Sequence, residues 1–115
     1  MSDAITLAEA IAALGEANAA LTERLAESRA LMDRAEEMFA AGTSVPEALG
    51  QLPVRAHEEA TDGAIRALLT ARSRLKRVLA RDAVDAGMPI EEIASVLEAR
   101  PDLIATYLAE QTPRS

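Results

Sequence analysis

The sequence contains no cysteine and no tryptophan, and its aromatic residues are one tyrosine and one phenylalanine. Without thiols there is no disulfide framework, thiolate nucleophile or thiolate zinc site, and a reducing, cytoplasmic location is expected. Because aromatic residues make up only 2% of the chain, the buried volume must come from Leu, Ile, Val and Met at helical spacing. The composition therefore predicts an all-α protein.

Other chemical patterns are missing as well. No run of 18 apolar residues occurs, and the N-terminus lacks the basic start and apolar stretch of a signal peptide, so we expect no membrane partner. The single histidine, His57, is followed by Glu58, but Thr61 stands where an H-E-x-x-H zinc motif needs its second histidine. No glycine-rich phosphate loop is present. We expect no enzyme activity, no catalytic residue, no metal ion and no cofactor.

Charge is distributed unevenly along the 115 residues, which have a formal net charge of -7. Residues 1–53 contain nine acidic residues against three arginines, whereas residues 54–115 contain ten acidic and nine basic residues. Six of those basic residues lie in 66–81, a stretch that contains no acid. The charge of the whole chain is therefore a poor guide to its partners.

Short signals mark where helices begin and end. Capping-box pairs are Thr6 with Glu9 and Ser44 with Glu47, while Gly42 and Gly87 suit the position just past a helix end. They predict a helix up to residue 41 and a second long helix that starts between residues 54 and 64 and ends at 86. The expected domains are a coiled-coil dimerisation helix (1–42), a connector with one helical turn (43–53) and a helical domain (54–115).

In the first helix the larger side chains recur at alternating steps of four and three, the a/d spacing of a coiled coil. This spacing predicts a homodimer or higher homo-oligomer. Asn18 falls at an a position, where one Asn lowers stability but fixes register and strand number. The alternative is that this helix packs along the second long helix of its own chain, with Asn18 partly exposed. The predicted dimerisation residues are Ile11, Leu14, Asn18, Leu21, Leu25 and Met32.

The second long helix is amphipathic. Its apolar arc contains Ile65, Leu68, Leu69, Leu75, Val78 and Leu79. Arg66, Arg74, Arg77 and Arg81 lie within roughly 80° of one another on the opposite side of the helical wheel.

Two short apolar stripes follow Gly87. The first contains Ile90, Ile93, Ala94 and Leu97, and the second opens at Pro101 and contains Leu103, Ile104, Tyr107 and Leu108. The run from Glu92-Ile93-Ala94 to the terminal Tyr107-Leu108 resembles the helix-turn-helix of sigma-factor region 4 and of response-regulator C-terminal domains. This resemblance covers residues 87–110. It implies a three-helix DNA-binding unit whose last helix lies in the major groove.

The sequence departs from that family at two positions. Glu98 stands at the turn position usually held by Gly, so it must adopt a positive φ at a steric cost or change the turn. Arg100 stands at the N-cap position usually held by Ser or Thr, although Pro101 and Asp102 partly compensate in the first turn.

The predicted DNA contacts come from two helices. Arg74, Arg77 and Arg81 would neutralise phosphates, while Arg100, Asp102 and Thr106 would face base edges or the backbone. The acidic residues Glu91, Glu92, Glu98 and Glu110 would repel phosphates. The alternative is that the arginines are solvated or pair with the acidic first helix.

The leading hypothesis is a small dimeric helix-turn-helix DNA-binding protein, either a transcriptional regulator or a phage-type DNA-packaging accessory. The alternative is a protein-interaction adaptor whose degenerate helix-turn-helix binds RNA polymerase, a toxin or another regulator. A third possibility is a purely structural oligomer.

Overall fold

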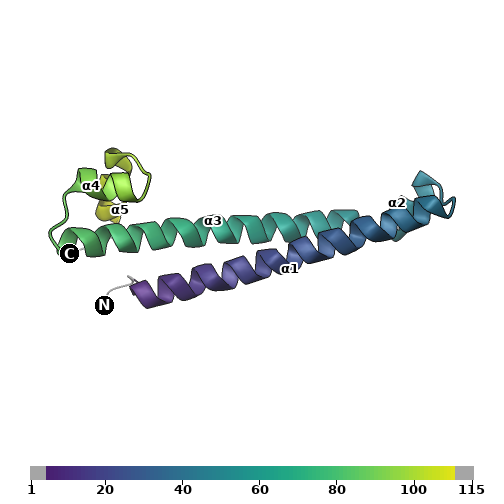
Figure 1. Ribbon diagram of the computed structural model, residues 1–115, viewed down its shortest axis with the longest axis horizontal. Coiled ribbons are helices and arrows are strands. Elements are labelled where there is room, and N and C mark those ends of the chain that lie inside the picture. Colours follow the sequence, from purple (N-terminus) through teal and green to yellow (C-terminus); the bar gives the residue numbers. More distant parts are fainter. Residues whose placement is uncertain (1–4, 111–115) are drawn as a thin grey trace. The chain divides into compact units, whose positions relative to one another are not determined.

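The computed structural model describes residues 5–110 and consists of five helices (Figure 1). They are α1 (Leu7–Ala40), α2 (Val45–Gln51), α3 (Val54–Asp85), α4 (Ile90–Val96) and α5 (Pro101–Glu110). No strand occurs within residues 5–110, and the predicted all-α class is confirmed. In the part of the chain that is described, no helix has the length and apolar character needed to cross a membrane.

The hydroxyls of the two predicted capping boxes, those of Thr6 and Ser44, cap the starts of α1 and α2. The Thr6 hydroxyl accepts a hydrogen bond from the backbone N–H of Glu9 and donates one to the Glu9 carboxylate, both at 3.1 Å. The Ser44 hydroxyl accepts from the backbone N–H of Glu47 at 3.3 Å. Each hydroxyl satisfies a backbone donor that has no partner inside the helix. The short helix α2 forms most of the connector between the two long helices.

The long helix α3 begins at Val54, directly after Pro53, and Asp62 and Gly63 lie inside it. The backbone N–H of His57 donates to the Pro53 carbonyl at 3.0 Å and closes the first turn. Proline suits this place because a helix leaves its first N–H groups without intrahelical acceptors. The helix thus starts at the earliest residue of the predicted interval.

Three helices end in the same backbone motif. Gly42, Gly87 and Glu98 follow α1, α3 and α4 with left-handed φ values of 90°, 94° and 53°. In each case the next residue donates its N–H to a carbonyl five positions earlier, at 2.9 to 3.0 Å, as in a Schellman motif. Glu98 is the one non-glycine residue with positive φ among residues 5–110, which is the first of the two alternatives predicted for its turn position.

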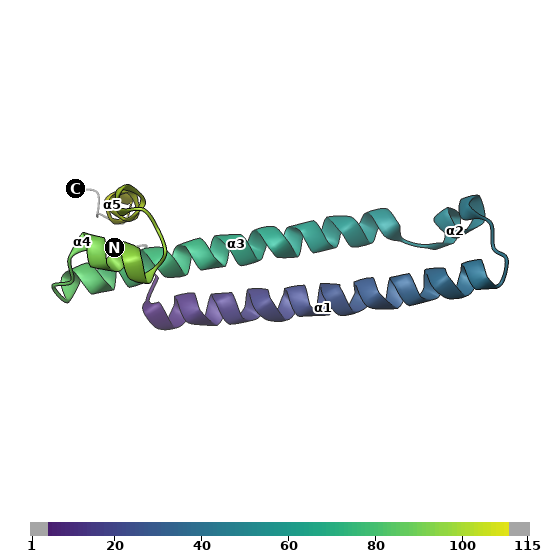
Figure 2. The same ribbon diagram turned by 45° about the horizontal axis from the view of Figure 1, so that its top comes forward.

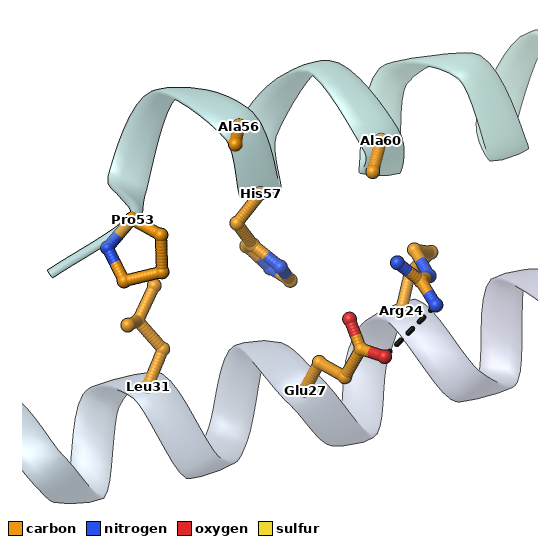
Figure 3. Close-up of a pocket in the computed structure, with 7 residues that line it drawn as sticks. All are labelled: Arg24, Glu27, Leu31, Pro53, Ala56, His57 and Ala60. Atoms are coloured by element: carbon orange, nitrogen blue, oxygen red, sulfur yellow. Dashed lines mark hydrogen bonds and ion pairs between the residues drawn. The ribbon is translucent and has the colours of Figure 1, made fainter.

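The chain divides into two compact units. The first, here called the hairpin unit, comprises residues 15–69: α1 from Gly15 onward, α2, and α3 as far as Leu69. Both ribbon views show these parts of α1 and α3 side by side, with α2 at the closed end (Figures 1 and 2). The close-up of Figure 3 places Leu31 opposite Pro53 and Arg24 opposite Ala60, so the two helices are antiparallel.

The heptad repeat of α1 has one partly buried row and one exposed row. Leu14 and Leu21, at predicted d positions, are half-buried. Ile11, Leu25 and Met32, at predicted a positions, are 55%, 57% and 54% exposed, and Asn18 is exposed as well. Packing on the second long helix of the same chain was the alternative to the coiled coil, and it occupies only one of the two rows. Self-association stays a prediction.

The second unit, here called the C-terminal unit, comprises residues 5–14 and 70–110 of the described chain. Its core is formed where α4 and α5 pack on the end of α3. The fully buried members are Ile93, at 1% exposure, and Ile104, at 0%. The other buried members are Ala80, Ala94 and Tyr107. This core fixes the angle at which the last two helices are presented.

The left-handed Glu98 gives the first prediction. Replacing Glu98 with Gly removes the steric cost of its Cβ at φ 53°, so the free energy of unfolding should rise by about 1 kcal/mol. Chemical denaturation followed by circular dichroism measures this change. The matched control Glu92→Gly, inside α4, should lower stability by about 1 kcal/mol. A loss of stability in Glu98→Gly would contradict the turn geometry.

Candidate functional site

The last helix, α5, presents two different faces. Ile104 and Tyr107 point into the core, and Leu103 and Leu108 are half-buried beside them. The predicted apolar stripe of this helix thus faces the core. The outward face carries Arg100, Asp102, Ala105, Thr106 and Ala109, all of which are exposed.

The polar residues on this outward face interact with one another. Arg100 Nε lies 3.5 Å from Asp102 Oδ1, in a pair whose side chains are 80% and 72% exposed. Such an exposed pair contributes roughly 0–1 kcal/mol, so a phosphate or a guanine edge can displace Asp102 at little cost. The Thr106 hydroxyl donates to the backbone carbonyl of Asp102 at 3.0 Å. Its oxygen can accept from a partner, but its proton is engaged.

The three arginines of α3 that were predicted to contact phosphates lie in three different environments. Arg74 is exposed and forms no ion pair within residues 5–110. Arg81 is half-buried, and its Nε and Nη2 both donate to Asp82 Oδ1, at 3.2 and 3.1 Å. Arg77 is half-buried too, with its guanidinium carbon 5.4 Å from the centre of the Tyr107 ring. Of the three, Arg74 is the readiest for a new partner.

The contact between Arg77 and Tyr107 links α3 to α5. A guanidinium within about 6 Å of a ring centre is attracted by the negative face of the ring. Because Tyr107 belongs to the core and Arg77 to the basic stretch, the contact helps to hold α5 against the helix that carries the cations. Sequence spacing could not reveal it, because the two residues lie on different helices and their contact depends on how those helices pack.

Acidic residues lie at both ends of α4. Glu91 and Glu92 occupy its first turn, Glu98 follows its end, and all three are exposed. Val96, on the same helix, is 68% exposed. A surface with acidic groups beside an open apolar side chain has the chemistry of a protein-binding site for a basic partner. The same carboxylates would repel a phosphate backbone.

The hairpin unit contains a shallow hollow of about 270 Å³ between α1 and α3 (Figure 3). Arg24 Nη2 and Glu27 Oε1 form an ion pair there at 2.8 Å. His57 Nε2 lies 3.4 Å from the Thr61 hydroxyl, which donates to the His57 carbonyl at 2.9 Å. The remaining lining is aliphatic: Leu31, Pro53, Ala56 and Ala60. Within the described chain, no group of three or more His, Cys, Asp or Glu residues is placed to hold a metal ion.

The Arg77–Tyr107 contact gives the second prediction. In a double-mutant cycle of Arg77→Gln and Tyr107→Leu, the coupling free energy should be about 1 kcal/mol in favour of the native pair. Urea denaturation of the four proteins measures it. The control cycle pairs Arg74→Gln with Tyr107→Leu and should show coupling near zero, because Arg74 is exposed. Equal coupling in the two cycles would contradict a specific contact.

Comparisons with protein-family models, with curated proteins and with solved structures gave no match for this chain. Function must therefore be argued from the residues and surfaces of this chain.

Proposed function

We propose that this chain is a small homodimeric helix-turn-helix protein that binds DNA in the cytoplasm, as a transcriptional regulator or a phage-type DNA-packaging accessory. The main support is the C-terminal unit, in which α4, a turn ending at Glu98, and α5 pack on the end of α3. This order of a longer helix and two short ones is the arrangement that places a last helix in a major groove. Arg100, which is exposed, directly precedes the first residue of α5.

In this proposal the affinity comes from α3 and the sequence preference from α5. Arg74 has its full charge available, and Arg81 can exchange Asp82 for a phosphate. These two residues are seven positions apart, so they lie on the same side of the helix, about 10 Å apart along its axis. Arg100 can bond a guanine edge after leaving Asp102. Phosphate contacts position the protein, and base contacts select the site.

The third prediction compares two arginines on one helix. Arg74→Glu should weaken binding to mixed-sequence DNA by about tenfold or more, and should make it less dependent on salt, because a phosphate contact is lost. Fluorescence anisotropy between low and physiological salt measures both effects. Arg72→Glu is the matched control, since Arg72 is exposed and lies about 200° around the same helix.

Equal loss of affinity in the two variants would mean that only total charge matters. No binding of the wild-type chain at low salt would refute the DNA-binding proposal.

A second candidate function is a protein-interaction adaptor. The observation that favours it is the acidic surface of α4, with Glu91 and Glu92 exposed beside Val96. A basic partner such as a surface of RNA polymerase, a toxin or another regulator would complement these charges. In this case the outward face of α5 contacts protein, and the Arg100–Asp102 pair stays intact.

The fourth prediction distinguishes the two functions. In the DNA-binding proposal, the double change Glu91→Gln and Glu92→Gln removes two charges that repel phosphates, so DNA affinity should rise severalfold. The same anisotropy titration measures it, with Glu36→Gln and Glu37→Gln in the hairpin unit as the charge-matched control. An adaptor would show no DNA binding in either double variant.

A further inference from the structure

The hairpin unit leaves one side of large apolar side chains uncovered. Its members are between 41% and 57% exposed, although they alternate with residues that pack between the two helices. We call this set the apolar flank. It consists of Leu25, Met32 and Phe39 on α1 and Ile65 and Leu69 on α3.

Helix geometry places these residues on one side of the pair. Each member directly follows a half-buried residue in the sequence, as Leu25 follows Arg24 and Ile65 follows Ala64. One residue corresponds to a rotation of 100° around a helix. Since the two helices are antiparallel, that rotation carries the following residue to the same side of the pair on both helices. The five members of the flank therefore lie on the same side of the hairpin unit, which by the same rule also carries the exposed acidic residues Glu58 and Asp62.

The row on α1 repeats at intervals of seven residues and includes one polar member. Asn18 lies one heptad before Leu25, is exposed, and its carboxamide forms no hydrogen bond with any residue that the structure describes. A heptad row packs best on another helix with the same repeat. The row from Asn18 to Phe39 spans about 31 Å at 1.5 Å per residue, which is the length of a short coiled-coil contact.

Charge shows which partner fits this row. The hairpin unit contains ten acidic and five basic residues, so two copies repel each other wherever their acidic side chains come close. The row itself has no charged residue: Asn18, Leu25, Met32 and Phe39 are all neutral. A two-fold axis parallel to the helices sets each residue of the row against its own copy without repulsion.

We propose that the apolar flank binds the same flank of a second copy of this chain, with the two α1 helices parallel and in register at Asn18. In this register the two carboxamides hydrogen-bond to each other across the interface. An antiparallel pairing centred on Leu25 would instead set Asn18 against Met32 and leave the amide without a partner. The proposal rests on the homodimer of the proposed function, and it replaces the predicted contacts of Leu14 and Leu21 with those of the flank.

The first test measures the mass of the full chain in solution by light scattering at micromolar concentration. The wild-type chain should have twice the mass of one chain. The double variant Leu25→Glu and Met32→Glu should have the mass of one chain. Ala26→Glu with Ala30→Glu is the matched control, because both alanines are exposed and lie away from the flank, and it should stay dimeric. A monomeric wild-type chain, or the same mass in both double variants, would overturn the proposal.

The second test uses cysteine cross-linking. Because the chain has no native cysteine, one introduced cysteine is its only thiol. In the proposed register, the single variants Asn18→Cys and Met32→Cys should each form a disulfide between two copies under mild oxidation. Ala30→Cys, two residues from Met32 and about 200° around the helix, should cross-link far more slowly. Cross-linking of Met32→Cys without Asn18→Cys would refute the parallel register, and equal rates at all three positions would refute the interface.

DNA titration of the same proteins distinguishes a failure of the proposed interface from a failure of the DNA-binding proposal. If the wild-type chain is dimeric through the flank but binds no DNA, the interface stands and the DNA-binding proposal fails. If the wild-type chain binds DNA and the flank variants stay dimeric, the interface fails and the DNA-binding proposal stands.

Discussion

A helix with a seven-residue repeat carries two rows of large side chains, and a single antiparallel neighbour covers only part of them. In the hairpin unit, the side of α1 that packs toward α3 contains Leu21 and the neighbouring positions Ala17 and Leu31, which are buried or half-buried. The row of Leu25 and Met32 then lies at the edge of the contact, where packing within one chain cannot reach it. The exposed flank is thus a consequence of pairing a long heptad helix with only one partner helix.

The C-terminal unit obeys a different constraint, which is set by the backbone. Its core requires α4 to stop and the chain to turn before α5, and the left-handed Glu98 makes that turn despite its Cβ. The burial of Ile93 and Ile104 offsets the local cost, because each removes a whole aliphatic side chain from water, worth roughly 2 kcal/mol. The scaffold therefore tolerates an unusual turn residue. The core residues determine how the helices pack, but they do not determine which charged residues stand on the exposed surface.

Local signals in the sequence predicted the helix ends well, because a cap depends on neighbouring residues alone. Thr6 with Glu9, Ser44 with Glu47 and the positive φ of Glu98 all follow from rules about adjacent backbone groups. The sequence could not decide which row of α1 faces its own chain, since the same spacing of four and three serves pairing within and between chains. It also could not place Arg77 on Tyr107, because that contact depends on how α5 packs.

The distribution of charge limits how this unit can approach DNA. The carboxylates of Glu91 and Glu92 sit in the first turn of α4, where a helix-turn-helix commonly meets the backbone through helix-end N–H groups. That contact is unfavourable here, so in the DNA-binding proposal the phosphates would lie on the side of α3 that carries Arg74 and Arg81. One chain offers few such cations, and each phosphate contact adds a similar step to the salt dependence. Useful affinity then requires two chains on one DNA, which makes any DNA function of this fold depend on self-association.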